Sequence, residues 1–102
     1  MSTLHTVNKS PFATNSLQSC LNHAKDGDTI LMIEDGVYGG TTGTTIALAV
    51  AARAGAVTVH VLEGDMAARG INPSRLINGV TPVDYAGFVT LAAGTDRTQA
   101  WL

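Results

Sequence analysis

Residues 29–33 form an almost uninterrupted apolar run, Thr-Ile-Leu-Met-Ile, with Asp28 before it and Glu34 and Asp35 after it. A short apolar run between acidic residues is typical of a strand that is covered on both faces, as in a parallel sheet with helices on its two sides. The run therefore predicts a sheet that is buried from both directions, which few arrangements of so short a chain can provide.

Strand-like and helix-like segments alternate along the chain. We predict strands at residues 4–7, 29–33 and 57–62, a short strand that begins or ends at Val83, and an edge strand at residues 99–102. Helices or helical turns are expected at about residues 15–25, 45–53, 66–69, 73–76 and 85–93, with Thr14 or Asn15 capping the first and Asp84 the last. This alternation predicts one α/β domain over residues 1–102, with three α/β/α layers around a mainly parallel sheet of four or five strands. The pattern does not give the strand order.

The chain is short and apolar enough that a partner would help to cover it. It has 102 residues, of which 45% are hydrophobic and only 14% charged. This composition excludes intrinsic disorder, but a chain of this length buries only roughly 65% of its unfolded surface. Residues 46–52 form a helix without a polar face, so it must be buried on more than one side. Either a neighbouring subunit covers it or it lies between the sheet and a loop.

Charge and cysteine content exclude several classes of protein. The net charge is −2 and the six Lys and Arg residues form no basic cluster, so direct binding to nucleic acid is not expected. One cysteine, Cys20, excludes an internal disulfide and favours a reducing compartment. The first eleven residues hold no apolar signal core, and the longest apolar run, residues 46–52, is too short to span a bilayer. We therefore expect a cytoplasmic protein that makes no membrane contact.

Cys20 is the one soft nucleophile, and two interpretations of it compete. As a thiolate it could accept sulfane sulfur as a persulfide and pass it on. However, it lies three residues after Leu17 on the apolar face of a predicted helix, too far from the helix start for the dipole to lower its pKa. Free cysteines in such places are often small buried apolar residues. Cys20 remains the only candidate catalytic residue.

The other candidate sites have simple structural interpretations. Asp35 and Tyr38 follow a strand, where α/β proteins often place a site, but Asp-Gly is also a common turn. Residues 39–45 are rich in glycine yet contain neither the lysine of a P-loop nor a dinucleotide fingerprint, which favours a flexible lid or loop. His5, His23 and His60 are widely spaced, and His60 is expected on a sheet face. We predict no metal, no cofactor and no catalytic triad.

Several segments, in order from end to end, resemble the DsrH/TusB family. They are residues 4–11 (LHTVNKSP), 33–38 (IEDGVY), 68–70 (ARG), 83–89 (VDYAGFV) and 99–102 (QAWL). Residues 39–53 match least. The resemblance implies a fold of the DsrE/F/H type and assembly with DsrE-like and DsrF-like subunits into a heterohexamer with two copies of each. It also implies persulfide relay to a small DsrC-like or TusE-like protein, with the principal acceptor cysteine on the DsrE-like subunit.

The family has two branches. One takes part in the oxidation of stored sulfur and the other in making 2-thiouridine in tRNA. Cys20 resembles the DsrH cysteine, which tRNA-branch members commonly lack, and both chain ends are closer to DsrH. The leading hypothesis is therefore a DsrEFH-type subunit of sulfur oxidation. The alternatives are a TusB-like subunit of tRNA thiolation, a purely structural subunit, and a small-molecule-binding module that uses residues 39–45.

Overall fold

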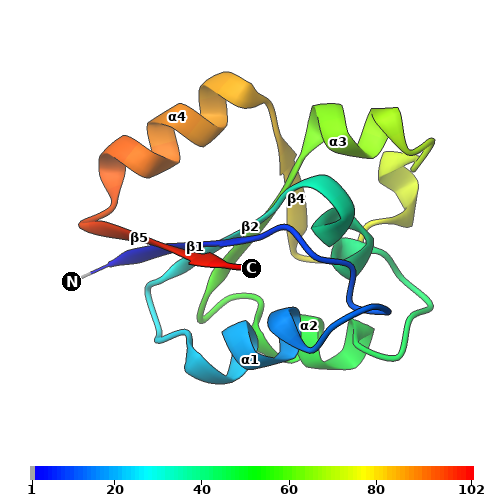
Figure 1. The fold of residues 1–102 in the computed structure, drawn as a ribbon, viewed down its shortest axis with the longest axis horizontal. Helices are drawn as coiled ribbons and strands as arrows, with labels where there is room; N and C mark the ends of the chain where they lie inside the picture. Colours follow the sequence, from blue (N-terminus) through cyan, green and yellow to red (C-terminus); the bar gives the residue numbers. More distant parts are fainter. Residues whose placement is uncertain (1) are drawn as a thin grey trace.

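A computed structural model describes residues 2–102 and shows one sheet of five parallel strands (Figure 1). The strands are β1 (Thr3–Val7), β2 (Thr29–Met32), β3 (Thr58–Leu62), β4 (Val80–Val83) and β5 (Arg97–Trp101). Their order is β4-β3-β2-β1-β5, so the first strand lies between the second and the last. Each neighbouring pair is parallel, which confirms the predicted sheet and supplies the order that the sequence pattern lacked.

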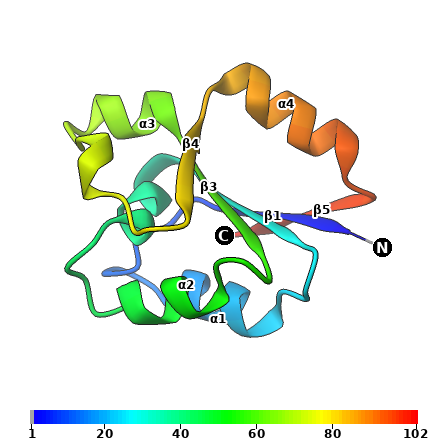
Figure 2. The ribbon, with the colours of Figure 1, turned by 180° about the vertical axis from the view of Figure 1, so that it is seen from behind.

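Helices cover both faces of the sheet, as predicted. In Figure 1, α1 (Ser16–His23) and α2 (Ala47–Arg53) lie below the sheet, and α3 (Glu63–Ala68) and α4 (Tyr85–Gly94) lie above it; Figure 2 shows the same division from behind. Two 3-10 helices, η1 (Glu34–Gly40) and η2 (Pro73–Arg75), complete the connections. The molecule therefore has the three α/β/α layers that the alternation predicted.

The main core lies between the sheet and the pair α1 and α2. Val7, Ile30, Met32, Val59 and Val61 point from the strands into one cluster with Leu17, Cys20, Leu21 and Val50. Because side chains alternate along a strand, the residues between them, such as Leu4 and Leu31, point to the opposite face and are also fully buried. Both faces of the central strands are therefore buried, as the apolar run at residues 29–33 predicted.

Element boundaries differ from the predictions by a few residues. The helical turn expected from Met66 begins at Glu63, since Glu63 and Asp65 suit the first turn of a helix. The last strand begins at Arg97 instead of Gln99, and α2 begins at Ala47 instead of Thr45. Asp84 caps α4 as expected: its Oδ1 accepts the backbone N–H of Gly87 at 2.7 Å.

The expectation of a flexible lid over residues 39–45 is wrong for its first two residues. Gly39 and Gly40 end the 3-10 helix η1 and are buried. A Cβ on Gly39 would collide with Leu17 Cδ2, and one on Gly40 would lie 2.7 Å from Val61 Cγ1. These glycines therefore let η1 pack against the core, while Thr42 to Thr45 lie in a turn outside any helix or strand, in keeping with the loop alternative.

Two helices expose apolar surface. Only Val50 of α2 is buried, and Leu48 on its outer face is 85% exposed, so the idea that this helix lies between the sheet and a loop is wrong. The α4 helix has no buried residue, and its Tyr85 and Val89 are 71% and 53% exposed. None of the helices within residues 2–102 is long and apolar enough to cross a bilayer.

A glycine substitution tests the packing of η1. An alanine at Gly36 would force its Cβ into the carbonyl of Val7, a backbone group that cannot move aside without disturbing β1. We expect Gly36→Ala to lower the free energy of unfolding by about 3 kcal/mol, measured by urea denaturation. Gly64→Ala is the matched control: it meets no atom within 4 Å in the helix α3, so it should be neutral or slightly stabilising. Equal effects of the two changes would contradict this account of η1.

Candidate functional site

Cys20 lies on the inner face of α1 and is fully buried. Leu17 and Leu21 flank it on the same face, one helical turn or less away, and all three belong to the main core. The helix reaches from Ser16 to His23, so Cys20 lies in its second turn, beyond the free N–H groups of the start. The burial that the helical spacing indicated is therefore present.

The surroundings of Cys20 disfavour its thiolate. Burial, and secondarily the negative charge of nearby Asp28, raise the pKa of Cys20 from 9.0 to about 12. At neutral pH the group is a protonated thiol, which is a weak nucleophile. In this conformation Cys20 is a packing residue of the core.

Asp28, whose charge acts on Cys20, is buried and accepts three hydrogen bonds. It is 4% exposed, and its Oδ1 accepts the backbone N–H of Thr3 at 3.0 Å. Its Oδ2 accepts the backbone N–H of Lys25 at 3.1 Å and meets His5 Nε2 at 2.9 Å. Burial alone would raise the pKa of Asp28, but these hydrogen bonds, that from His5 first, outweigh it and hold the pKa below its ordinary 3.8. Asp28 is therefore an ionised carboxylate at neutral pH.

The hydrogen-bond partners of His5 fix its tautomer. Trp101 Nε1 lies 3.0 Å from His5 Nδ1, and an indole N–H can only donate. His5 Nδ1 must therefore accept, so Nε2 carries the proton and donates it to Asp28. The result is a chain of hydrogen bonds from Trp101 through His5 to Asp28, which we call the Trp-His-Asp chain.

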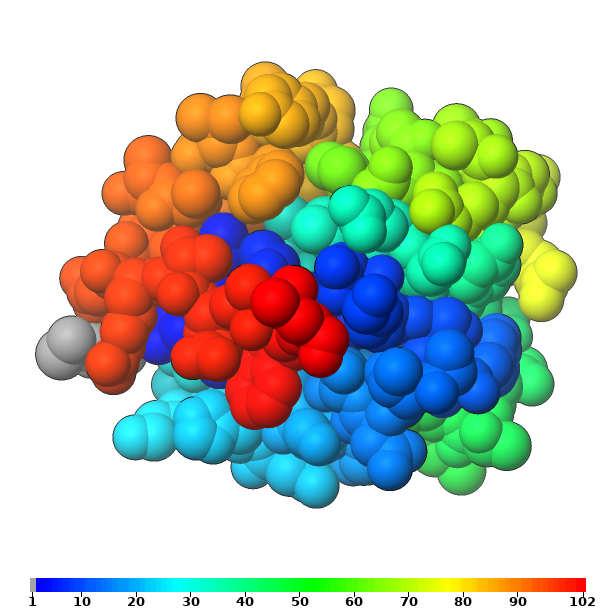
Figure 3. Space-filling model, viewed as in Figure 1, coloured from blue at the N-terminus to red at the C-terminus, as the bar shows by residue number. Residues whose placement is uncertain are grey.

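The Trp-His-Asp chain holds the carboxyl-terminal segment in place. Trp101 packs against the rings of His5 and His23, with ring centres 6.2 and 5.6 Å away. Next to it, Ser16 Oγ donates to the carbonyl of Leu102 at 3.4 Å. Figure 3 shows this end of the chain, in red, at the surface against the blue amino-terminal part. The end of β5 thus covers one side of His5.

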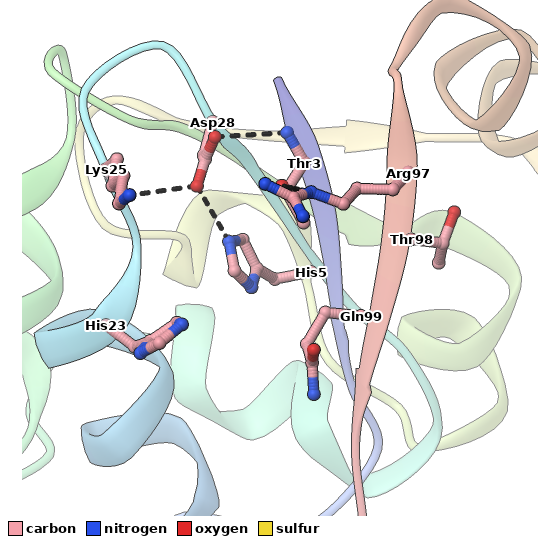
Figure 4. A pocket seen from close by; sticks show the side chains of 8 residues that line it. All are labelled: Thr3, His5, His23, Lys25, Asp28, Arg97, Thr98 and Gln99. Carbon is pink, nitrogen blue, oxygen red and sulfur yellow. Dashed lines mark hydrogen bonds and ion pairs between the residues drawn. The ribbon is translucent and has the colours of Figure 1, made fainter. Parts of the chain in front are cut away.

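A pocket of about 430 Å³ opens beside the Trp-His-Asp chain (Figure 4). The strands β1 and β5 contribute Thr3, His5, Arg97, Thr98 and Gln99 to its lining. His23 at the end of α1, with Lys25 and Asp28 that follow it, forms the other side. The pocket lies at the amino-terminal end of the strands, away from the edge where α/β proteins usually place their sites.

The acidic residues after β2, where the sequence suggested a turn, form the first turn of the 3-10 helix η1. Asp35 accepts Arg69 Nε at 3.0 Å in an exposed ion pair. Glu34 is also exposed, and its left-handed backbone (φ 50°) is held by a hydrogen bond from its N–H to Asp65 Oδ2 at 2.6 Å. Tyr38 lies 6.5 Å from the ring of Phe12. Asp35 is thus engaged in a surface ion pair and Tyr38 in an aromatic contact, and neither belongs to the core cluster around Cys20.

The histidines differ in their surroundings. His60 lies in β3 on a sheet face, as the alternation predicted; this face is the one opposite the main core, and His60 Nδ1 lies 2.7 Å from Thr81 Oγ1. His5 and His23 lie 6.4 Å apart, ring centre to ring centre. Within residues 2–102, no three His, Cys, Asp or Glu side chains are grouped so that they could hold a metal ion.

The sequence prediction missed the pairing of His5 with Asp28. A histidine between Leu4 and Thr6 in a strand that is covered on both faces must find a hydrogen-bond partner. The one acid directly before the next buried strand, Asp28, was a suitable candidate. The pairing depends on β1 and β2 being neighbours, with Leu4 opposite Thr29, and strand order was the information that the sequence lacked.

One known protein family matches most of the sequence. The family described as DsrH like protein matches residues 9–98. Among curated proteins, a protein TusB of Sodalis glossinidius is 36% identical over 98 residues, which is 96% of this chain and 99% of the relative. A protein TusB of Escherichia coli is 33% identical over the same share of both chains.

Two solved structures share the fold. The ychN protein of Escherichia coli superimposes with a TM-score of 0.79 at 19% identity, over 98% of this chain and 99% of the other. A Methanobacterium thermoautotrophicum protein of unknown function gives a TM-score of 0.72 at 15% identity, over 94% and 95%. At these identities the likeness concerns the fold alone.

The burial of Cys20 predicts a slow thiol. At pH 8 we expect iodoacetamide to alkylate the folded chain about a hundredfold more slowly than the chain in urea, because the raised pKa leaves little thiolate. Intact mass over time measures both rates. Since the folded pKa lies above the unfolded one, the contribution of the thiol to stability is present below about pH 9 and is lost towards pH 12. Cys20→Ala should lack this part of the alkaline loss, and rapid alkylation of the folded chain would contradict the prediction.

The Asp28 carboxylate predicts an acid-dependent stability. Asp28→Asn places an amide N–H₂ among three donors, so we expect a loss of about 2 kcal/mol at pH 7, measured by urea denaturation. Because the folded pKa of Asp28 is lowered, its contribution is present above about pH 4 and is lost as the pH falls through the folded pKa.

Asp26→Asn is the matched control, since this neighbouring carboxylate is 82% exposed and lies 3.9 Å from Arg53. It should leave the stability at pH 7 within about 0.5 kcal/mol of the unchanged chain. The difference between the Asp28→Asn variant and the unchanged chain should shrink at pH 3. A difference that is the same at both pH values would contradict the role given to the Asp28 charge.

Proposed function

Since the chain belongs to the DsrH/TusB family, we propose that it is a subunit of a cytoplasmic sulfur-relay complex, in which it supports assembly while a partner subunit is the principal sulfur carrier. The observation that carries this proposal is the full burial of Cys20, the only thiol of the chain, together with its pKa of about 12. A carrier needs a thiolate that a partner can reach.

The relay step itself belongs to a DsrE-like subunit. In each transfer, a cysteine thiolate attacks the outer sulfur of a donor persulfide. A new S–S bond forms, the S–S bond of the donor breaks, and the donor leaves as a thiolate. The DsrE-like cysteine accepts sulfur in this way and passes it to a DsrC-like or TusE-like protein. Cys20 has a secondary role: it accepts sulfur slowly, or only inside the assembled complex.

The partners are DsrE-like and DsrF-like subunits, with two copies of each subunit in the complex. The exposed apolar surfaces of α2 and α4 support association, because Leu48, Tyr85 and Val89 lie open to solvent in the isolated chain. A small α/β chain that leaves two helix faces uncovered is completed by a second subunit. Neither nucleic acid nor a membrane is a partner in this proposal.

The sequence ends and the relatives support different branches. Cys20 and both ends of the chain resemble DsrH, which supports oxidation of stored sulfur and is our leading choice. The relatives at 36% and 33% identity are TusB proteins, which supports tRNA thiolation as the second candidate. Genes for a dissimilatory sulfite reductase and a DsrC-like protein beside this gene would favour the first, and genes for tRNA thiolation would favour the second.

The assembly proposal predicts that charge on the open helices weakens the complex. The double change Leu48→Glu and Val89→Glu should reduce the affinity for co-expressed DsrE-like and DsrF-like subunits at least about tenfold, because burying an unpaired carboxylate is costly. Native mass spectrometry measures the complex. Ser74→Glu with Asn78→Glu is the control, since both residues are exposed and polar. A chain that stays monomeric with both partners present would overturn the proposal.

The proposed roles of Cys20 and of the DsrE-like cysteine predict the effect of replacing each of them. In the assembled complex, Cys20→Ser should leave assembly intact and retain more than about half of the sulfur transfer, because the residue is buried. Replacing the DsrE-like acceptor cysteine should abolish transfer. Polysulfide loading followed by intact mass of each subunit checks both. If this chain gains sulfur before its partners do, and transfer stops without Cys20, then Cys20 is the main carrier.

A further inference from the structure

The pocket beside the Trp-His-Asp chain has no part in the sulfur relay proposed above. It lies at the amino-terminal end of the strands, and neither Cys20 nor the open faces of α2 and α4 line it. Its volume of about 430 Å³ falls within the range of small-molecule sites, roughly 300–1,000 Å³. The question is which chemistry its lining would recognise.

Two basic residues from different elements, Lys25 and Arg97, line this pocket. Figure 4 shows Lys25 and His23 on one side and Arg97 and Gln99 on the other, with Asp28 and His5 between them. Arg97 Nε donates to Thr3 Oγ1 at 3.3 Å, which directs the guanidinium across β1. Among residues 2–102, neither Lys25 nor Arg97 has a carboxylate within 4.0 Å. Lys25 and Arg97 therefore line the same pocket, and neither forms an ion pair within the described residues.

The one acid in the lining, Asp28, offsets one of the two positive charges, so that Lys25, Arg97 and Asp28 together leave a net charge of +1. Asp28 is 4% exposed and already accepts hydrogen bonds from Thr3, Lys25 and His5. Both nitrogens of His5 are likewise engaged, by Asp28 and by Trp101. Asp28 and the two His5 nitrogens are thus engaged in hydrogen bonds within the protein. The side-chain donors left for a ligand belong to Lys25, Arg97, His23 and Gln99.

We propose that this pocket binds the phosphate dianion of a small phosphate monoester. Lys25 and Arg97 hold the phosphate from two sides, and arginine is suited to bind two phosphate oxygens at once. Inorganic phosphate alone is smaller than the pocket. The remaining lining is polar, with Thr98 and Gln99, so the rest of the ligand is hydroxylated and not apolar.

A free small molecule fits this geometry better than a nucleic acid backbone. Binding to a backbone requires cations spaced along a track of several phosphates, whereas Lys25 and Arg97 converge on one hollow. The chain has six Lys and Arg residues in all, and two of them line this one pocket. Affinity for a phosphate group is therefore expected without affinity for RNA.

The test is titration of the full chain with glycerol phosphate and with inorganic phosphate, against sodium chloride at equal ionic strength. The Trp101 indole N–H resonance and the His23 ring resonances report binding, because both groups lie beside the pocket. We expect saturable shifts, with glycerol phosphate binding more tightly than inorganic phosphate. Arg97→Gln and Lys25→Gln should each weaken binding about tenfold, the value of one charge-assisted hydrogen bond.

Arg75→Gln is the matched control: it removes the same charge from an exposed position in η2, away from the pocket, and should leave binding unchanged. Shifts that also follow sodium chloride, or that are equal in the Arg97→Gln and Arg75→Gln variants, would overturn the proposal. So would tighter binding of RNA than of glycerol phosphate. The sulfur-transfer assay of the complex is separate, so the failure of either proposal leaves the other intact.

Discussion

The buried carboxylate of Asp28 joins three parts of the molecule. It accepts the N–H of Thr3 at the start of β1, the N–H of Lys25 after α1, and Nε2–H of His5. Through His5 it also fixes Trp101 at the end of β5. A charge in this position is stable only when donors surround it. This one ionised and fully hydrogen-bonded group therefore ties together β1, the segment before β2 and the end of β5.

The same carboxylate influences the only thiol. The Asp28 charge adds to burial in disfavouring the thiolate of Cys20, so the interaction that stabilises the strand order also keeps the thiol protonated. A relay subunit can tolerate a silent cysteine when its partners supply the reactive one. It cannot tolerate the loss of its fold, and the packing of Cys20 with Leu17 and Leu21 contributes to that fold.

The small size of the chain explains why apolar residues of α2 and α4 are exposed to solvent. Five strands present two faces, and residues 2–102 supply only four short α-helices to cover them. The face towards α1 and α2 has the continuous core, while α4 covers the other face without burying any of its own residues. How much apolar surface stays exposed depends on how all the helices and strands pack together. Leu48, Tyr85 and Val89 are therefore exposed, although residues of these types are common in cores.

Local pattern was enough for some features. The apolar run at residues 29–33 predicted a strand buried on both faces, the alternation predicted three layers, the spacing of Leu17, Cys20 and Leu21 predicted an inward-facing thiol, and Asp84 predicted a helix cap. These features depend on residues a few positions apart, so the sequence by itself determined them. Gly39 and Gly40 show the limit, since their contacts with Leu17 and Val61 come from distant segments.

The candidate site was decided at the tertiary level. His5, Asp28 and Trp101 are 23 and 73 residues apart in succession, and nothing local in the sequence joins them. They meet because β1 lies between β2 and β5 in the sheet, which also brings Arg97 opposite Lys25 across the pocket. Strand order is fixed by the total burial of both sheet faces, and a sum over the whole chain has no local signature in the sequence.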